Sequence, residues 1–199
     1  IALDGHRIAI RNVSLSGMAD DVKVIVPGKT LNELNKILAS DAESQVNIYF
    51  TSNHILFEFE NTTVVSRLIE GEYFKVNKML SNDYKTKVVI NKKDLLDSID
   101  RANLLIKEND KKPIIINVID GSMEVKVTST LGSSKEDIDI QKDGSDIMIG
   151  FNPKFLLDAL RAIDDEYVSI YFVNPKAPCF IRDNNETYTY LILPVNFNA

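Results

Sequence analysis

The sequence predicts an α+β protein made of repeated modules, each with one strand, one helix and three further antiparallel strands. Two observations support this prediction. Short apolar runs are followed, three times along the chain, by the periodic pattern of an amphipathic helix. In each copy one residue stands between the apolar run and the helix: Pro27, Asn91 and Asn152. These three residues are spaced 64 and 61 residues apart. A nearly constant spacing over three copies indicates an architectural repeat, with antiparallel sheets and the helices on one face.

The first copy contains the least regular version of the pattern. Val22, Val24 and Val26 share one face of an expected strand, and a capping box from Thr30 to Glu33 is expected to open the helix. Three strands are expected after it, at 46–50, 54–60 and 63–70, and the helix stripe is Leu31, Leu34, Ile37 and Leu38.

The second and third copies follow the pattern more closely. The helix of the second copy is expected to bury Leu95, Ile99, Ala102 and Ile106, and Asp120-Gly121 is a strong hairpin signal between 114–119 and 123–130. In the third copy, Asn152 is a suitable N-cap and Pro153 suits the first helical position. Its helix stripe is Leu156, Ala159, Leu160 and Ile163, followed by strands at 167–173, 179–182 and 188–195.

The segment 71–83 lacks strand periodicity and is the expected domain boundary, which gives domains at 1–82 and 83–199. Ile1 falls inside an expected strand and the chain does not begin with Met, so we expect a fragment of a longer protein. The second domain then holds two complete modules, and the first holds one module and a remnant.

Composition narrows the functional class. The net charge of −6 argues against a protein that grips nucleic acid over its whole surface. With one cysteine, Cys179, and two histidines, we expect no disulfide, no metal site and no cofactor. There is no signal peptide and no apolar run long enough for a bilayer, so a cytoplasmic location is expected.

The turn Asp4-Gly5-His6-Arg7 is the one constellation that suggests catalysis. A hydrolase interpretation makes His6 a general base oriented by Asp4. The alternative is a structural or binding turn, because no other catalytic motif accompanies it. We therefore expect a protein that is not an enzyme.

The outer faces of the helices suggest contact with DNA. They carry the cations Lys29, Lys36, Lys93, Arg101, Lys154 and Arg161. The alternative is a solvated face with intrahelical pairs, Asp97 with Arg101 and Asp158 with Arg161. Glu33 and these aspartates dilute any basic stripe, so the charges favour the solvated face and do not indicate strong phosphate contact. Loose contact that does not depend on DNA sequence is still compatible with them.

The final strand raises a different possibility. Ile192 is expected in the core, which places Leu191, Leu193 and Val195 on the opposite face of the strand. They either line a groove with the boundary residues Tyr73, Phe74 and Met79, or Leu191 and Leu193 also face the core.

Four segments stand in order along the chain: LDGHRIAIR, VVSRLIEGEYFKVNKML, IGFNPKFLLDAL and YLILPV. Together they resemble one family, the bacterial DNA polymerase III β subunit, which is the replicative sliding clamp. LDGHRIAIR resembles its T-D-[GS]-H-R-L-A turn, and VVSRLIEGEYFKVNKML is similar to its S-K-L-[IV]-[DE]-G-x-[FY]-P-x-[YV] segment. IGFNPKFLLDAL and YLILPV resemble its F-N-x-x-[YF] helix and its Y-[LV]-[IV]-[ML]-P-[MV] terminus. The resemblance implies the DNA-clamp fold with two modules per domain. This chain would then be the second half of the middle domain and the whole third domain.

The resemblance also implies a function. Two subunits would join head to tail in a ring that encloses duplex DNA. The ring would tether the DNA polymerase III catalytic subunit, the clamp loader and repair or translesion polymerases. These partners would insert short motifs into a cleft between the middle and third domains, whose residues here would be Gly5, His6, Arg7, Ile8, Lys78, Met79, Asn152, Phe155, Leu191, Leu193, Pro194 and Val195.

Two departures from the family pattern affect only the details of that cleft: Phe74 stands where Pro is usual, and Asn196 where Arg is usual. Leu104 and Leu105 match the third-domain side of the subunit interface, although they are equally compatible with a core position. Without the first domain, this fragment is not expected to close a ring. A purely structural repeat protein, a third interpretation, predicts no peptide binding.

Overall fold

The computed structural model forms two compact units, one made of Ile1–Ser14 with Ser81–Ala199 and the other of Leu15–Leu80. The two strands that open the chain therefore belong to the unit that holds modules two and three. Each unit is described by itself below. The structure describes residues 1–14, 21–38, 45–76, 79–80, 83–107, 110 and 112–197.

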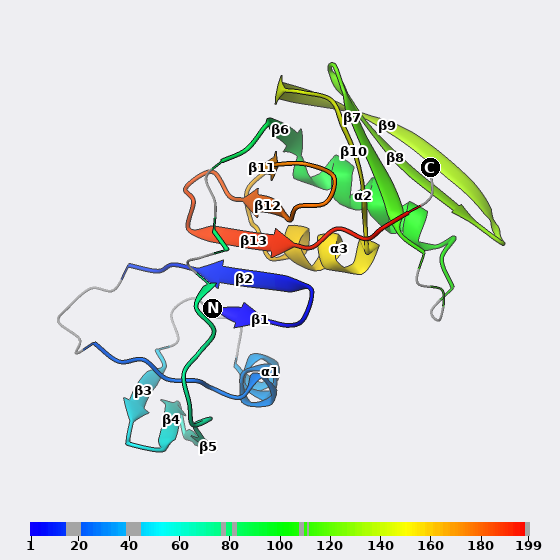
Figure 1. Cartoon of the computed structure of the whole chain (residues 1–199). Helices are drawn as coiled ribbons and strands as arrows, with labels where there is room; N and C mark the ends of the chain where they lie inside the picture. Colours follow the sequence, from blue (N-terminus) through cyan, green and yellow to red (C-terminus); the bar gives the residue numbers. More distant parts are fainter. Residues whose placement is uncertain are drawn as a thin grey trace. The chain divides into compact units, whose positions relative to one another are not determined.

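The larger unit contains two complete modules (Figure 1). Module two runs through β6 (Thr86–Asn91), α2 (Lys92–Asn103), β7 (Ile114–Ile119), β8 (Ser122–Ser129) and β9 (Gly132–Gly144). Module three runs through β10 (Ile147–Phe151), α3 (Pro153–Arg161), β11 (Tyr167–Phe172), β12 (Cys179–Arg182) and β13 (Tyr188–Ile192). Each has one strand, one helix and three strands, which confirms the predicted order of elements.

The two modules complete each other through their opening strands. β6 of module two pairs with β11 of module three, and β10 of module three pairs with β7 of module two, all antiparallel. Their strands form one sheet, to which β2 (Arg7–Arg11) adds beside β13 and β1 (Ala2–Leu3) adds beside β2. The first strands of the chain, β1 and β2, therefore lie beside its last strand, β13, in this sheet.

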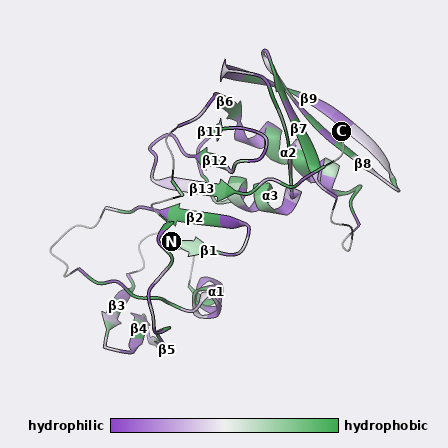
Figure 2. Cartoon of the chain, viewed as in Figure 1, coloured by the Kyte–Doolittle hydropathy of each residue, from purple (hydrophilic) through white to green (hydrophobic). Residues whose placement is uncertain are grey.

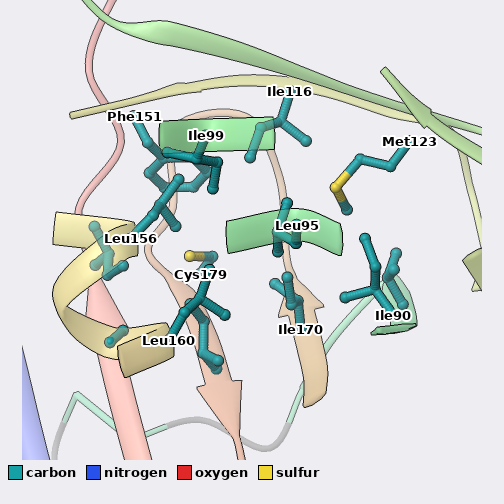
Figure 3. Packing of buried hydrophobic residues seen from close by; sticks show 14 of the residues in the cluster. Ile90, Leu95, Ile99, Ile116, Met123, Phe151, Leu156, Leu160, Ile170 and Cys179 are labelled. Atoms are coloured by element: carbon teal, nitrogen blue, oxygen red, sulfur yellow. The ribbon is translucent and has the colours of Figure 1, made fainter. Parts of the chain in front are cut away.

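The helices α2 and α3 lie side by side and bury their apolar stripes in one core cluster (Figure 1). Figure 2 shows hydrophobic and hydrophilic residues on both helices, as expected for elements with one buried face. In Figure 3, Leu95 and Ile99 of α2 and Leu156 and Leu160 of α3 surround the buried Cys179. Because the stripes meet in a single cluster, both helices lie on one face of the sheet, as the repeat predicts.

The first turns of α2 and α3 use the predicted caps. The Asn152 side chain accepts a hydrogen bond from the Lys154 backbone N–H at 3.0 Å, with Pro153 in the first turn. Asn91 accepts from Lys93 and Asp94, at 2.9 and 3.2 Å. These bonds satisfy amides that have no partner inside the helix.

The smaller unit contains only one module, with α1 (Gly28–Ile37), β3 (Asn47–Phe50), β4 (His54–Phe59) and β5 (Thr62–Arg67). The predicted strand at Val22–Val26 is wrong, since these residues form no strand. Among the described residues, this segment makes one backbone hydrogen bond to the strand side of its unit, from the Ile69 N–H to the Ile25 carbonyl at 2.9 Å. The opening strands of the other modules each pair with a strand of the neighbouring module. Within the part of the smaller unit that the structure describes, the segment at Val22–Val26 has no such pairing.

Two further expectations for α1 are wrong. The helix begins at Gly28 after Pro27, without a side-chain cap, and the Thr30 hydroxyl instead lies 2.7 Å from that of Ser66. Of the predicted stripe, Leu34 is buried, but Leu31 and Ile37 are about half exposed. A single module cannot cover the whole stripe.

The long strand β9 ends module two at Gly144. Lys142 lies on this strand, and its ammonium contacts the carboxylates of Asp146 and Asp120. Gly144 ends the strand with φ of +106°, a conformation that side chains disfavour, and a Cβ there would overlap the Lys85 carbonyl. No helix among the described residues is long and apolar enough to cross a membrane.

Candidate functional site

The turn between β1 and β2 is held by Asp4. One oxygen of its carboxylate accepts the backbone N–H groups of His6 and Arg7, at 2.9 and 3.1 Å, and the other accepts the Arg7 Nε–H at 2.8 Å. Burial alone would raise the pKa of Asp4, but the hydrogen bonds from Arg7 and His6 lower it below its usual value. The carboxylate binds backbone and guanidinium rather than the imidazole, so the hydrolase alternative finds no support.

Arg7 connects this turn to helix α3 and to β13. Its Nη1 lies 2.5 Å from the Asp158 carboxylate and 3.0 Å from the Tyr190 hydroxyl. Its guanidinium also lies over the Phe155 ring, 4.5 Å from the ring centre. Burial alone would lower the pKa of Arg7, and the bonds to Asp158 and Asp4 raise it instead, so the side chain stays charged.

The C-terminal segment runs directly past the turn. The Leu193 N–H donates to the His6 carbonyl at 2.9 Å, and the Val195 N–H donates to the Gly150 carbonyl at 2.8 Å. A Cβ at Gly150 would lie 2.7 Å from a ring carbon of Phe197, so glycine is needed for this close approach. The segment after β13 is thereby fixed between the turn and β10.

The predicted cleft residues of the larger unit gather around this crossing. Phe155 is half-buried, with its ring 5.9 Å from that of His6, and His6 and Gly5 are exposed. Asn152 is half-buried; its N-cap bond uses the side-chain oxygen, and its amide NH2 has no hydrogen-bond partner among the described residues. Leu193, Pro194 and Val195 are likewise half-buried.

Ile8 and Leu191 lie on the face of the sheet that points away from the main core. They are directly opposite each other on β2 and β13, and Phe180 of β12 is opposite Leu191. Neighbouring residues of β13, Tyr190 and Ile192, point into the main core, which Leu191 does not join. Leu191 is only 1% exposed and Ile8 5%, so neither offers an open surface in this structure.

The boundary residues of the smaller unit are described only in part. Met79 is 36% exposed, and its backbone N–H donates to the Val76 carbonyl at 2.8 Å. Tyr73 and Phe74 are exposed. The predicted cleft residue Lys78 lies outside the described residues.

The helix cations divide into two groups. Lys36 pairs with Glu33 at 2.8 Å, Arg101 with Glu136 at 2.6 Å, and Arg161 with Asp100 at 3.0 Å. The ammonium groups of Lys29, Lys93 and Lys154 are exposed and have no partner among the residues that the structure describes. All three hold the same repeat position, two residues after the helix cap.

Two predicted intrahelical pairs are wrong. Arg101 binds Glu136 of β9 rather than Asp97, and Arg161 binds Asp100 of α2 while Asp158 binds Arg7. In both cases a carboxylate on a neighbouring element accepts from the guanidinium through both of its oxygens.

The comparison with known families is decisive. Residues 1–75 match the family model of the DNA polymerase III beta subunit, central domain, and residues 77–196 match that of its C-terminal domain. The chain belongs to the DNA polymerase III beta subunit family. The family and the α+β clamp fold predicted from the sequence are both confirmed.

Several relatives show how much of the family this chain represents. A protein of Staphylococcus aureus named Beta sliding clamp is 36% identical over 98% of this chain and 52% of its own length. A solved beta subunit structure from Eubacterium rectale is 65% identical with a TM-score of 0.95, covering 99% of this chain and 54% of that one. The sliding clamp structure from Bacillus subtilis is 35% identical with a TM-score of 0.92 over 98% and 52%. The chain thus spans about half the length of these beta subunits.

The residues matched to the beta subunit interface have different environments. Leu104, just after α2, is 78% exposed, while Leu105 is partly buried against the main core. Of the pair, only Leu104 leaves most of its apolar side chain exposed.

Sequence reasoning missed that Asp158 and Tyr190 would be partners of Arg7. The sequence held a weak signal for Asp158. It stands three residues after Phe155, and this spacing places both side chains on the same side of the helix. No sequence pattern showed that β2 would pair with β13, which brings Arg7 to them.

Proposed function

We propose that this chain is part of a DNA sliding clamp, a non-catalytic processivity subunit that encircles duplex DNA and tethers polymerases. Its family membership and its fold support this proposal. Residues 1–82 would be the second half of the middle domain and 83–199 the third domain. The full protein would form a head-to-tail homodimer ring. Its partners would be the catalytic subunit of DNA polymerase III, the clamp loader and repair or translesion polymerases.

The tethering surface would be the crossing of the C-terminal segment with the β1–β2 turn. The observation that carries this proposal is the hydrogen bond from Leu193 to His6, which joins two segments from opposite ends of the chain beside Phe155. Leu193, Val195 and Phe155 offer half-buried apolar surface, and the Asn152 amide offers a donor for a peptide carbonyl. A few apolar walls with one or two fixed polar groups are typical of a peptide site.

The ligand would be a short peptide with two adjacent apolar residues near its end, one of them Leu or Phe. Burial of two such side chains is worth about 3–6 kcal/mol before ordering costs, which corresponds to micromolar affinity. Met79 and Lys78 are proposed for the same cleft from the family resemblance.

Calorimetric titration with such a peptide tests the proposal. Truncation of Leu193 or Met79 to Ala should weaken binding by more than about 1 kcal/mol, as expected for central contacts. Leu131→Ala is the matched control, because Leu131 is 55% exposed at the β8–β9 turn. Unchanged affinity in the Leu193 and Met79 variants, with the fold intact, would exclude this site.

DNA contact would come from the cations of the helices, chiefly Lys29, Lys93 and Lys154, which have no described ionic partner. A clamp that slides must avoid dense phosphate pairing, and the net charge of −6 agrees with this requirement. We expect weak binding of linear duplex DNA without sequence preference. Substitution of Lys93 and Lys154 by Gln should weaken it further, and a salt-resistant nanomolar complex would contradict the proposal.

The subunit interface would use Leu104, with Leu105 behind it. Since the first domain of the family would supply the other half of that interface, this chain alone should not close a ring. Sedimentation equilibrium tests the point, and a closed dimeric ring formed by the 199-residue chain would overturn it.

A further inference from the structure

We infer that Asp158 is a positioning residue for the peptide cleft, acting through Arg7 on the ring of Phe155. The inference rests on the proposed function and adds to it a residue that does not itself face the ligand. Asp158 is 38% exposed on α3, and it lies 2.5 Å from the Arg7 guanidinium.

Arg7 is held from three directions. Asp4 binds its Nε from the turn, while Asp158 of α3 and Tyr190 of β13 share its Nη1, at distances of 2.5–3.0 Å. An arginine side chain is flexible when free, and these bonds fix its plane. Two of its nitrogens are therefore engaged within the protein, and the main role of Arg7 is to support its surroundings rather than to bind peptide carbonyls.

The fixed guanidinium in turn supports Phe155. It lies 4.5 Å from the ring centre, at the distance of a cation–π contact. Because Phe155 is only half-buried, its ring has space to change rotamer when this contact is lost. The contact keeps the ring beside His6, where it can form one wall of the cleft before a peptide arrives. A wall that is already in place reduces the ordering cost of binding.

The repeat supplies a strict comparison for this role. Glu33, Asp97 and Asp158 all hold the position six residues after the helix cap. Glu33 binds Lys36 within its own helix, whereas Asp158 binds an arginine from a strand. The acid is common to the three modules, and the link to Phe155 belongs to Asp158 alone among them. Asp97→Ala is therefore the matched control.

The test measures affinity for a peptide with two adjacent apolar residues near its end. We expect Asp158→Ala to weaken binding about tenfold and Asp158→Glu, which restores a carboxylate, to recover most of the loss. Asp97→Ala should change affinity less than about twofold. In an Arg7→Lys background, Asp158→Ala should have little further effect, because lysine cannot both bind the carboxylate and lie flat on the ring.

A structural readout separates this inference from the proposed function. In the free protein, Asp158→Ala should shift the aromatic NMR signals of Phe155, and Asp97→Ala should leave them unchanged. Failure of the wild-type chain to bind any such peptide would reject the proposed function, while these signals would still test the link. Unchanged Phe155 signals in Asp158→Ala would overturn the inference. So would a double variant whose loss of peptide affinity equals the product of the losses in Asp158→Ala and Arg7→Lys alone.

Discussion

Equivalent leucines in the three modules have very different environments. Leu31, Leu95 and Leu156 each stand four residues after the helix cap, yet Leu31 is 48% exposed whereas Leu95 and Leu156 are at most 1% exposed. The difference arises from partnership between modules. β6 and β10 each pair with a strand of the other module, and α2 packs on α3. The helix stripe sets which face can be buried, and the second module determines whether it is buried.

The largest expected effect is at these leucines. Leu95→Ala should lower the free energy of unfolding of the larger unit by about 2–5 kcal/mol, because a closed core cannot fill the cavity. Leu31→Ala should cost the smaller unit less than about 1 kcal/mol, since its side chain is half in water already. Amide hydrogen exchange reports the two units separately. Equal costs would refute the idea that module pairing determines burial.

A smaller effect is expected at the helix cap. Asn91→Ala should destabilise the larger unit by about 1 kcal/mol, because Lys93 and Asp94 lose the acceptor for their N–H groups. Asn91→Ser keeps an acceptor and should restore most of the stability. Urea unfolding followed by circular dichroism can measure both variants. If the Ala and Ser variants are equally unstable, the cap does not explain the effect.

The smallest effect is a pH dependence of the larger unit. Burial alone would raise the pKa of Asp183, but hydrogen bonds from the Thr187 hydroxyl and the Tyr188 N–H lower it below the usual value. A carboxylate with a lowered folded-state pKa stabilises the fold above its unfolded pKa of about 4, and this contribution is lost as the pH falls towards the folded value. Unfolding at several pH values should therefore show a weaker dependence in Asp183→Asn. An equal slope in both proteins would contradict this role.

Much of the larger unit could be predicted because its signals are local. Asn152 and Pro153 specify a helix start by their own chemistry, and Asp120-Gly121 specifies a hairpin whose strands lie at Ile114–Ile119 and Ser122–Ser129. The prediction of a strand at Val22–Val26 was wrong because a strand also needs a neighbouring strand to pair with. The alternation of apolar residues does not show whether such a neighbour exists.

The sequence indicated candidate residues for the site but not the contacts that connect them. The resemblance indicated Arg7 and Phe155, and the structure brings them within 4.5 Å. Their link through Asp158 depends on where β2 enters the sheet, which no local pattern specifies. For the same reason, Arg161 was assigned to Asp158 rather than to Asp100.

The central claim is that the surface around Leu193 binds the tethering peptide. Methyl-labelled NMR spectra recorded while such a peptide is added test it directly. We predict shifts of the methyl signals of Leu193, Val195 and Met79. We predict no shifts for Leu131 of the β8–β9 turn or Ile119 of β7, which are both exposed apolar residues. Shifts confined to Leu131 or Ile119, or none at Leu193 with saturating peptide, would contradict the account.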